Sequence, residues 1–152
     1  MLDTDHFKRF NDTYGHEAGD RVLQAVGQLL RESVPGSALA CRYGGEAMTL
    51  VLPQSPPETT LDRAETIRQA ISQVQVNYNG LSLEAISASL GVASVPSHGP
   101  TGSDLLKAAA DALYQAKAKG RNQVIVAPRG STDEPDQKVA GYPAHWQSQD
   151  IS

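Results

Sequence analysis

Two adjacent glycines, Gly44 and Gly45, constrain the fold of this chain more than any other feature. They lie between two short apolar runs, residues 39–41 and 50–52. Tight hairpin turns require positive φ angles, which glycine adopts without steric cost. The pattern therefore predicts a β-hairpin with both glycines at positive φ in its turn. Glu46 follows directly, where a backbone without side chains allows a bulky ligand to approach.

Three segments have the apolar spacing of amphipathic helices. The first is predicted from about Glu17 to Ser33 and is ended by Pro35-Gly36. The second begins after Pro56-Pro57. The third begins at Ser103, a good N-cap, and ends near Gly120, where a C-cap glycine belongs.

Strand signals lie between these helices. Alternating apolar residues over 86–92 predict a half-buried strand, and Gln123 to Ala127 form a short β-branched run. Asn79-Gly80 is a strong hairpin-turn signal. Strands that alternate with helices but pair through hairpins favour an α+β fold, with a mainly antiparallel central sheet flanked by helices.

The chain of 152 residues divides into one predicted domain, residues 1–129, and a tail. From residue 130 to residue 152 the composition changes to polar and turn-forming residues without periodicity. This segment is predicted to be a flexible tail or linker, with Tyr142 and Trp146 as docking residues. Met1 to Asp3 resemble the end of a strand whose beginning is missing, so we expect a fragment of a longer protein.

Charge and cysteine content limit the class of protein. The formal net charge of −4 argues against a general nucleic-acid surface, although Mg²⁺ can still neutralise the phosphates of a bound nucleotide. Cys41 is the only cysteine, which we interpret as a small core thiol on a strand. No apolar run approaches the roughly 18 residues that span a bilayer, and no signal peptide is visible. We expect a cytoplasmic protein, or the cytoplasmic part of a membrane-anchored one.

Two carboxylates, Asp3 and Asp5, flank Thr4 at the end of the presumed first strand. Residues two apart on a strand share a face, so the two can form one acidic cluster. Alternatively, Asp3 acts alone before a turn into a helix, with backbone N–H groups from Asp5 to Lys8 pointing at a phosphate. Asp3 and Glu46 would then hold Mg²⁺, which takes its remaining ligands from phosphate oxygens. Because Asp-x-Asp is common, a solvated strand end remains the alternative.

A polar, glycine-bearing segment follows, from Asn11 to Asp20. An Asn amide and an Asp carboxylate suit the edge of guanine, which both donates and accepts hydrogen bonds. Turn and capping chemistry favours the same residue types, and for Asp20 both interpretations remain open.

Taken together, these residues resemble the GGDEF domain family, the diguanylate cyclases of bacterial signalling. The family pattern D-x-D-x-F-K-x-x-N-D-x-x-G-H-x-x-G-D is met from Asp3 to Asp20 at its main positions. The R-Y-G-G-[DE]-E-F signature aligns with Arg42 to Met48, and A-K-x-x-G-R-N matches Ala116 to Asn122. Three blocks in the correct order make chance similarity implausible.

The resemblance implies a fold related to the palm of polymerases and nucleotidyl cyclases. Family members bind one GTP per domain and pair two domains face to face. Each 3′-hydroxyl attacks the other α-phosphate, giving cyclic di-GMP and pyrophosphate. Implied partners are therefore GTP or cyclic di-GMP, Mg²⁺ or Mn²⁺ and a second copy of the domain, with no nucleic-acid polymer. We also expect fusion to a sensory or regulatory domain, and a family helix and most of the first strand before residue 1.

Site residues carry over by position. Asp3 and Glu46 would be catalytic and, with the Thr4 carbonyl, would hold the metal. The nucleotide-binding positions would be Phe7 and Lys8 in the phosphate loop, Asn11 and Asp20 on guanine, Gly44 and Gly45 in the turn, and Lys117 and Arg121 on the terminal phosphates. The last two lie one turn apart at a predicted helix end, where they would form a cationic arm. The alternative for them is a solvated helix terminus that complements the dipole.

The chain departs from the family pattern in several places. Ala47 stands where the signature has Glu, which we expect to impair catalysis more than binding, and Met48 replaces the usual aromatic residue. His6 stands where a second aromatic is common. The product-inhibition motif Arg-x-x-Asp is missing, since its positions hold Pro35 and Ala38, so we expect no feedback through that site.

The sequence therefore predicts a diguanylate cyclase-type domain whose activity is affected by Ala47. One alternative is a degenerate, non-catalytic domain that senses GTP or cyclic di-GMP and regulates a partner domain. A structural dimerisation module fits less well, because it leaves the polar residues without a role.

Overall fold

The computed structural model describes residues 1–129, so the predicted tail of residues 130–152, with Tyr142 and Trp146, lies outside the described residues. In the described part of the chain the elements are β1 (Leu2–Thr4), α1 (Phe7–Tyr14), α2 (His16–Glu32), β2 (Leu39–Gly44), β3 (Ala47–Val51), α3 (Pro57–Ser72), β4 (Asn77–Tyr78), β5 (Leu81–Ser82), β6 (Ala88–Val92), α4 (Gly102–Ala118) and β7 (Val124–Val126). None of the described helices is long and apolar enough to cross a membrane.

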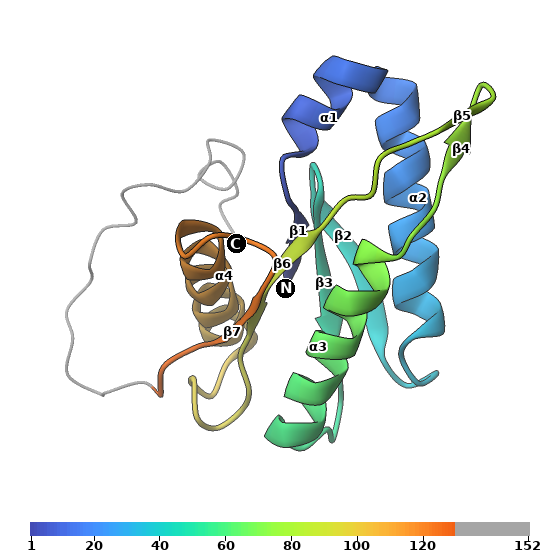
Figure 1. Cartoon of the computed structure of the whole chain (residues 1–152). Coiled ribbons are helices and arrows are strands. Elements are labelled where there is room, and N and C mark those ends of the chain that lie inside the picture. Colours follow the sequence, from blue (N-terminus) through green and yellow to red (C-terminus); the bar gives the residue numbers. More distant parts are fainter. Residues whose placement is uncertain (130–152) are drawn as a thin grey trace.

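The central sheet has the strand order β2-β3-β1-β6-β7, and only β6 and β7 pair in parallel. Helices α2 and α3 lie on one side of this sheet and α4 on the other (Figure 1). The prediction of an α+β fold with a mainly antiparallel sheet is confirmed. Strand β6 is buried through Gly91, so the prediction of a half-buried strand was wrong. The alternation of side chains along β6 reflects packing against helices on both sides of the sheet, rather than one face exposed to solvent.

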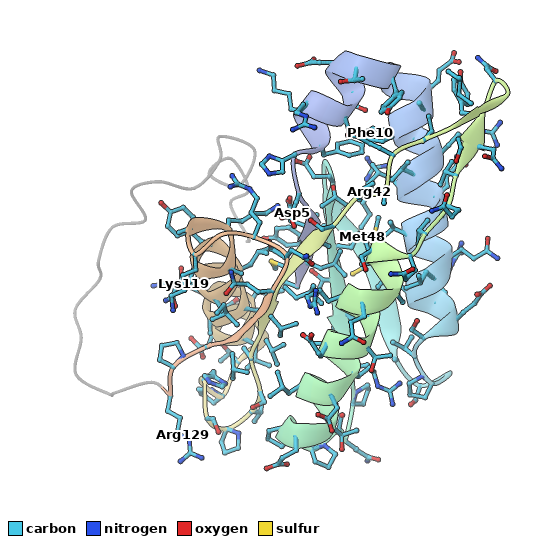
Figure 2. The ribbon with its side chains drawn as sticks, in the orientation of Figure 1. Asp5, Phe10, Arg42, Met48, Lys119 and Arg129 are labelled. Atoms are coloured by element: carbon cyan, nitrogen blue, oxygen red, sulfur yellow. The ribbon has the colours of Figure 1, made fainter. Side chains whose placement is uncertain are left out.

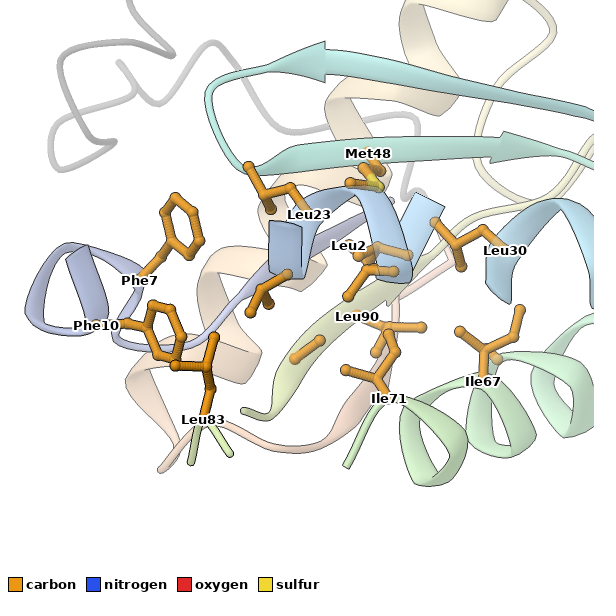
Figure 3. Packing of buried hydrophobic residues seen from close by; sticks show 14 of the residues in the cluster. Leu2, Phe7, Phe10, Leu23, Leu30, Met48, Ile67, Ile71, Leu83 and Leu90 are labelled. Carbon is orange, nitrogen blue, oxygen red and sulfur yellow. The ribbon is translucent and has the colours of Figure 1, made fainter. Parts of the chain in front are cut away.

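The main core lies between the sheet and the pair α2 and α3 (Figure 3). Leu2, Met48 and Leu90, from three neighbouring strands, pack against Leu30 of α2 and Ile67 of α3. Full burial of each such side chain contributes about 1.5–3 kcal/mol. Because Leu2 is 1% exposed, this packing holds β1 in the middle of the sheet, and the residues at its end are held with it.

The start of α4 differs from the prediction. The N-cap is Thr101 rather than Ser103. The Asp104 amide donates to Thr101 Oγ1 at 3.1 Å, and the Thr101 amide donates back to the Asp104 carboxylate at 3.1 Å. This reciprocal pair satisfies two free helix-end donors at once, which a single Ser103 cap cannot do. Gly120 follows the helix at φ 115°, as its predicted capping position requires.

Both predicted hairpins are present. Asn79 and Gly80 have φ angles of 49° and 77°, as a tight two-residue turn between β4 and β5 requires. In the β2–β3 hairpin Gly45 has φ 53°, but Gly44 has φ 159° and is close to extended. Both φ angles are positive, as predicted, although only Gly45 lies in the left-handed region that favours glycine. A register shift between Arg42 and Gly44 accompanies the turn.

The structure also differs from the prediction for Cys41 on the edge strand β2. Cys41 is exposed, so the interpretation as a core thiol was wrong. Its thiol lies 3.7 Å from the carbonyl oxygen of Thr49 on the neighbouring strand. An edge strand has only one neighbour in the sheet, and alternation along β2 turns Cys41 away from the side chains that face α2.

The close approach of α4 to β6 predicts a large effect of Gly91→Ala. A Cβ there would lie 2.0 Å from the Ala109 carbonyl oxygen and 2.5 Å from the Leu113 amide nitrogen. Helix backbone cannot move aside cheaply, so we expect the free energy of unfolding to fall by about 3 kcal/mol in urea titrations. Gly27→Ala is the matched control, because its Cβ meets open space on a helix. Equal stability of the two variants would contradict the packing described here.

Candidate functional site

The end of β1 and the glycine turn meet through strand register. Asp3 pairs with Ala47 across β1 and β3, so Glu46 and Gly45 lie at the same end of the sheet as Asp3 and Thr4. Glu46 is half-buried. The described residues contain no group of three or more acidic, His or Cys side chains close enough to bind one metal. The fold thus brings Asp3, Thr4 and Glu46 to the same end of the sheet, but it does not cluster their carboxylates around a single metal position.

Lys117, in the last turn of α4, extends its side chain onto the end of β1. Its Nζ lies 2.8 Å from Asp3 Oδ1 and 2.9 Å from Asp5 Oδ1. It also donates to the Thr4 carbonyl oxygen at 3.0 Å. The Asp3 and Asp5 side chains are only 8% and 1% exposed. Burial of two carboxylates at this distance requires a positive charge, which Lys117 supplies.

The oxygen atoms around the Lys117 ammonium group indicate whether the site suits a divalent cation. Two carboxylates and a backbone carbonyl are hard oxygen ligands, the kind that Mg²⁺ and Mn²⁺ accept. Lys117 Nζ lies among them as a monovalent stand-in. Asp3 and the Thr4 carbonyl therefore have the donor chemistry that suits the metal implied by the family resemblance, and Glu46 lies at the same end of the sheet.

Asp5, labelled in Figure 2, binds groups from the β6 segment, from α4 and from the turn after α4. Its carboxylate accepts hydrogen bonds from Ser87 Oγ and Ser89 Oγ, both at 2.7 Å, and from the Asn122 amide at 3.0 Å. Burial alone would raise the pKa of Asp5, but these serine hydroxyls and the charge of Lys117 hold it below its ordinary value. Sequence reasoning left Asp5 out of the site residues. Two serines spaced two apart before an apolar strand, and so on one face of it, were the available signal.

The start of α1 is the predicted phosphate loop. The ring of Phe7 is buried and stacks on Phe10 with centroids 6.3 Å apart, so only the backbone of Phe7 can face a ligand. Lys8 is exposed. His6 occupies the N-cap position at φ 55°, and no side chain caps this helix end. Uncapped N–H groups and the helix dipole favour an anion at this end.

Asn11 and Asp20 lie on consecutive helices. Asp20 lines a cavity of about 450 Å³ between α2 and the β2–β3 hairpin. Asn11 packs on Gly19, where a Cβ would lie 1.9 Å from its Oδ1. Glycine at position 19 thus leaves room for the Asn11 side chain against α2. The capping alternative for Asp20 was wrong, because α2 begins at His16 with Gly15 as its N-cap.

Arg121 lies beyond the end of α4, which stops at Ala118. The prediction that Lys117 and Arg121 share one helix end was therefore wrong. Arg121 and Asn122 have φ angles of 64° and 47°, and the Arg121 amide donates to the Ala116 carbonyl oxygen at 2.9 Å. The predicted cationic arm therefore consists of Lys117, in the last turn of α4, and Arg121, in the left-handed turn that follows the helix.

Comparison with known proteins agrees with this fold. The family model described as diguanylate cyclase, GGDEF domain, matches residues 1–123. Diguanylate cyclase DgcM of Escherichia coli is 40% identical over 127 residues, which cover 84% of this chain and 30% of that protein. The response regulator PleD of Caulobacter vibrioides is 38% identical over 126 residues, covering 82% and 28% respectively.

Solved structures show the same fold. The GGDEF domain of PA1120 from Pseudomonas aeruginosa superposes with a TM-score of 0.79 at 31% identity, covering 85% of this chain and 80% of that one. The GGDEF domain of DgcB from Caulobacter crescentus, in complex with c-di-GMP, has a TM-score of 0.74 at 32% identity, with coverages of 82% and 74%. The chain belongs to the GGDEF domain family. It spans less than a third of the length of the two curated relatives named above.

Proposed function

We propose that this domain binds GTP with Mg²⁺ and, as a homodimer, condenses two GTP molecules into cyclic di-GMP at a rate reduced by Ala47. One observation carries the proposal. The buried end of β1 presents Asp3, Asp5 and the Thr4 carbonyl around the Lys117 ammonium group, one strand away from the glycine turn and Glu46. Family membership supplies the reaction class.

In the proposed reaction, each 3′-oxygen forms a bond to the α-phosphorus of the other nucleotide. The bond from that phosphorus to pyrophosphate breaks, and the hydroxyl proton passes to solvent. Asp3, Glu46 and the Thr4 carbonyl would hold Mg²⁺, which when bound neutralises phosphate charge and polarises the reacting oxygens. Lys117 and Arg121 would bind the terminal phosphates, and the uncapped N–H groups at the start of α1 would also bind phosphate.

Guanine would be held by Asn11 and Asp20. A carboxylate accepts from the N1–H and N2–H₂ groups of guanine, which adenine does not present in that arrangement. Asp20 lines a cavity of a size suited to a base, and the missing side chain at Gly19 leaves room for Asn11 against the same helix. Neither residue is needed as a helix cap.

A second candidate follows from Ala47. A methyl group neither binds a metal nor accepts a proton, so the domain could retain GTP or cyclic di-GMP and regulate a partner without turnover. A structure of the relative SiaD is described as a complex with its activator SiaC, which supports partner-dependent regulation in the family. Fusion to a sensory or regulatory domain is part of either proposal.

The deciding experiment is calorimetric titration of the chain with GTP and Mg²⁺, followed by chromatography of the same mixture for cyclic di-GMP. Binding with product supports the cyclase, and binding without product supports the sensor. Absence of binding would contradict both functions.

Asp20→Ala is expected to weaken GTP binding by about tenfold, because one base-edge contact of this kind contributes about 1–3 kcal/mol of discrimination. Binding of ATP should remain unchanged. Competition titrations with both nucleotides measure the selectivity. Gln24→Ala, in the same cavity wall, is the control for general loss of the pocket. Unchanged selectivity in Asp20→Ala would remove Asp20 from the guanine site.

A further inference from the structure

We propose that Arg68 of α3 is a positioning residue, which holds the Arg121–Asn122 turn in the conformation that receives the terminal phosphates of the nucleotide. The inference rests on the proposed function and adds to it a residue outside all three family motif blocks quoted above.

The contact joins segments that are 54 residues apart in the chain. Arg68 Nη1 donates to Asn122 Oδ1 at 2.8 Å and lies 3.5 Å from the Asn122 carbonyl oxygen. Glu65, one turn earlier on α3, accepts from Arg68 Nε at 3.0 Å and from Nη2 at 2.5 Å. The planar guanidinium is thereby fixed on one side, with its remaining donors directed at Asn122. The Arg68 side chain is only 18% exposed.

The turn needs such support. Arg121 and Asn122 are consecutive non-glycine residues in the left-handed region, at φ 64° and 47°. Each such residue costs on the order of 1 kcal/mol and persists only where the surroundings determine its conformation. Arg68 holds the Asn122 side chain, while the Asn122 amide donates to Asp5 Oδ2 at 3.0 Å. The direction of the Arg121 side chain follows from this conformation.

Asn122 also connects the Arg121–Asn122 turn to the end of β1. Asp5, held by the Asn122 amide, is bound through its other oxygen to Lys117, which also pairs with Asp3. Both proposed phosphate-binding cations, Lys117 and Arg121, thus depend on the position of Asn122. Loss of Arg68 should therefore weaken binding of the β- and γ-phosphates more than binding of the base.

The test is Arg68→Ala compared with Arg63→Ala. Arg63 lies on the same helix and makes a tertiary hydrogen bond of similar length, 3.0 Å, to the Ser33 carbonyl oxygen far from the site. Calorimetric titrations with GTP and with GMP, both with Mg²⁺, separate terminal phosphates from base and sugar. We expect Arg68→Ala to weaken GTP binding by about tenfold relative to GMP, and Arg63→Ala to leave the GTP-to-GMP ratio of the wild type. Equal ratios in all three proteins would overturn the inference.

Amide hydrogen exchange without nucleotide tests the holding contact separately. The Asn122 amide should be protected in the wild type and in Arg63→Ala, and should exchange at least tenfold faster in Arg68→Ala relative to amides of β6. Unchanged protection would overturn the role of Arg68. If the wild type binds neither nucleotide, the proposed function fails, and with it the role in phosphate binding, whatever the exchange result.

Discussion

Replacement of Ala47 by glutamate is expected to raise cyclic di-GMP production by about 100-fold or more, a typical effect of one group that assists proton transfer or metal binding. Residue 47 lies opposite Asp3 on the neighbouring strand, so their side chains share one face of the sheet. A carboxylate at position 47 would join Asp3 and Lys117 at the end of β1. GTP affinity should change little, because guanine and phosphate contacts come from other residues.

Turnover at saturating GTP and Mg²⁺, measured by chromatography, checks this expectation. Ala47→Gln is the matched control, since it has the shape of glutamate without its charge. Ala47 is 1% exposed, so unfolding curves of both variants should accompany the rates. Equal turnover of the wild type and Ala47→Glu, or an equal gain in Ala47→Gln, would remove position 47 from the chemistry.

Replacement of Lys117 by methionine should lower the free energy of unfolding by about 3 kcal/mol in metal-free buffer. Removal of one partner from a buried ion pair leaves uncompensated charge, and here two carboxylates lose the same cation. Urea unfolding near neutral pH in the presence of a chelator measures the change. Lys117→Arg keeps the charge and should recover most of the loss. Stability equal to the wild type in Lys117→Met would mean that Asp3 and Asp5 do not need this partner.

Acidification should reduce the difference in free energy of unfolding between the wild type and Lys117→Met. In the wild type the folded-state pKa of Asp5 lies below its ordinary value of 3.8. The resulting stabilisation is complete above that value and is lost as the pH falls through the folded-state pKa. Lys117 causes part of this lowering, so Lys117→Met has less of it to lose. Urea unfolding from about pH 7 down to about pH 3 would test this, and a constant difference would contradict it.

Local patterns in the sequence were sufficient for most elements of the fold, although they gave no bounds for the short helix α1. The spacing of Val22, Val26 and Leu30 predicts α2, and Asn79-Gly80 predicts the β4–β5 turn, because helix periodicity and turn preference act over a few residues. The three motif blocks similarly place Asp3, Glu46 and Lys117 among the candidate site residues. Helix capping was less predictable, since Thr101 and Ser103 both qualify and only the reciprocal bond to Asp104 decides between them.

Contacts between distant segments required the tertiary structure. The sequence identified Asp3 and Lys117 as separate ligands of metal and phosphate, but the fold of the sheet and α4 brings them within 2.8 Å of one another. Asp5 and Arg68 gained their roles only through partners far along the chain, Asn122 above all. The sequence by itself determined the three long helices, the hairpin turns and most site residue types, because those depend on neighbouring residues. The tertiary structure alone decided which charges meet, because strand register and helix packing set the distances on which electrostatic interactions depend.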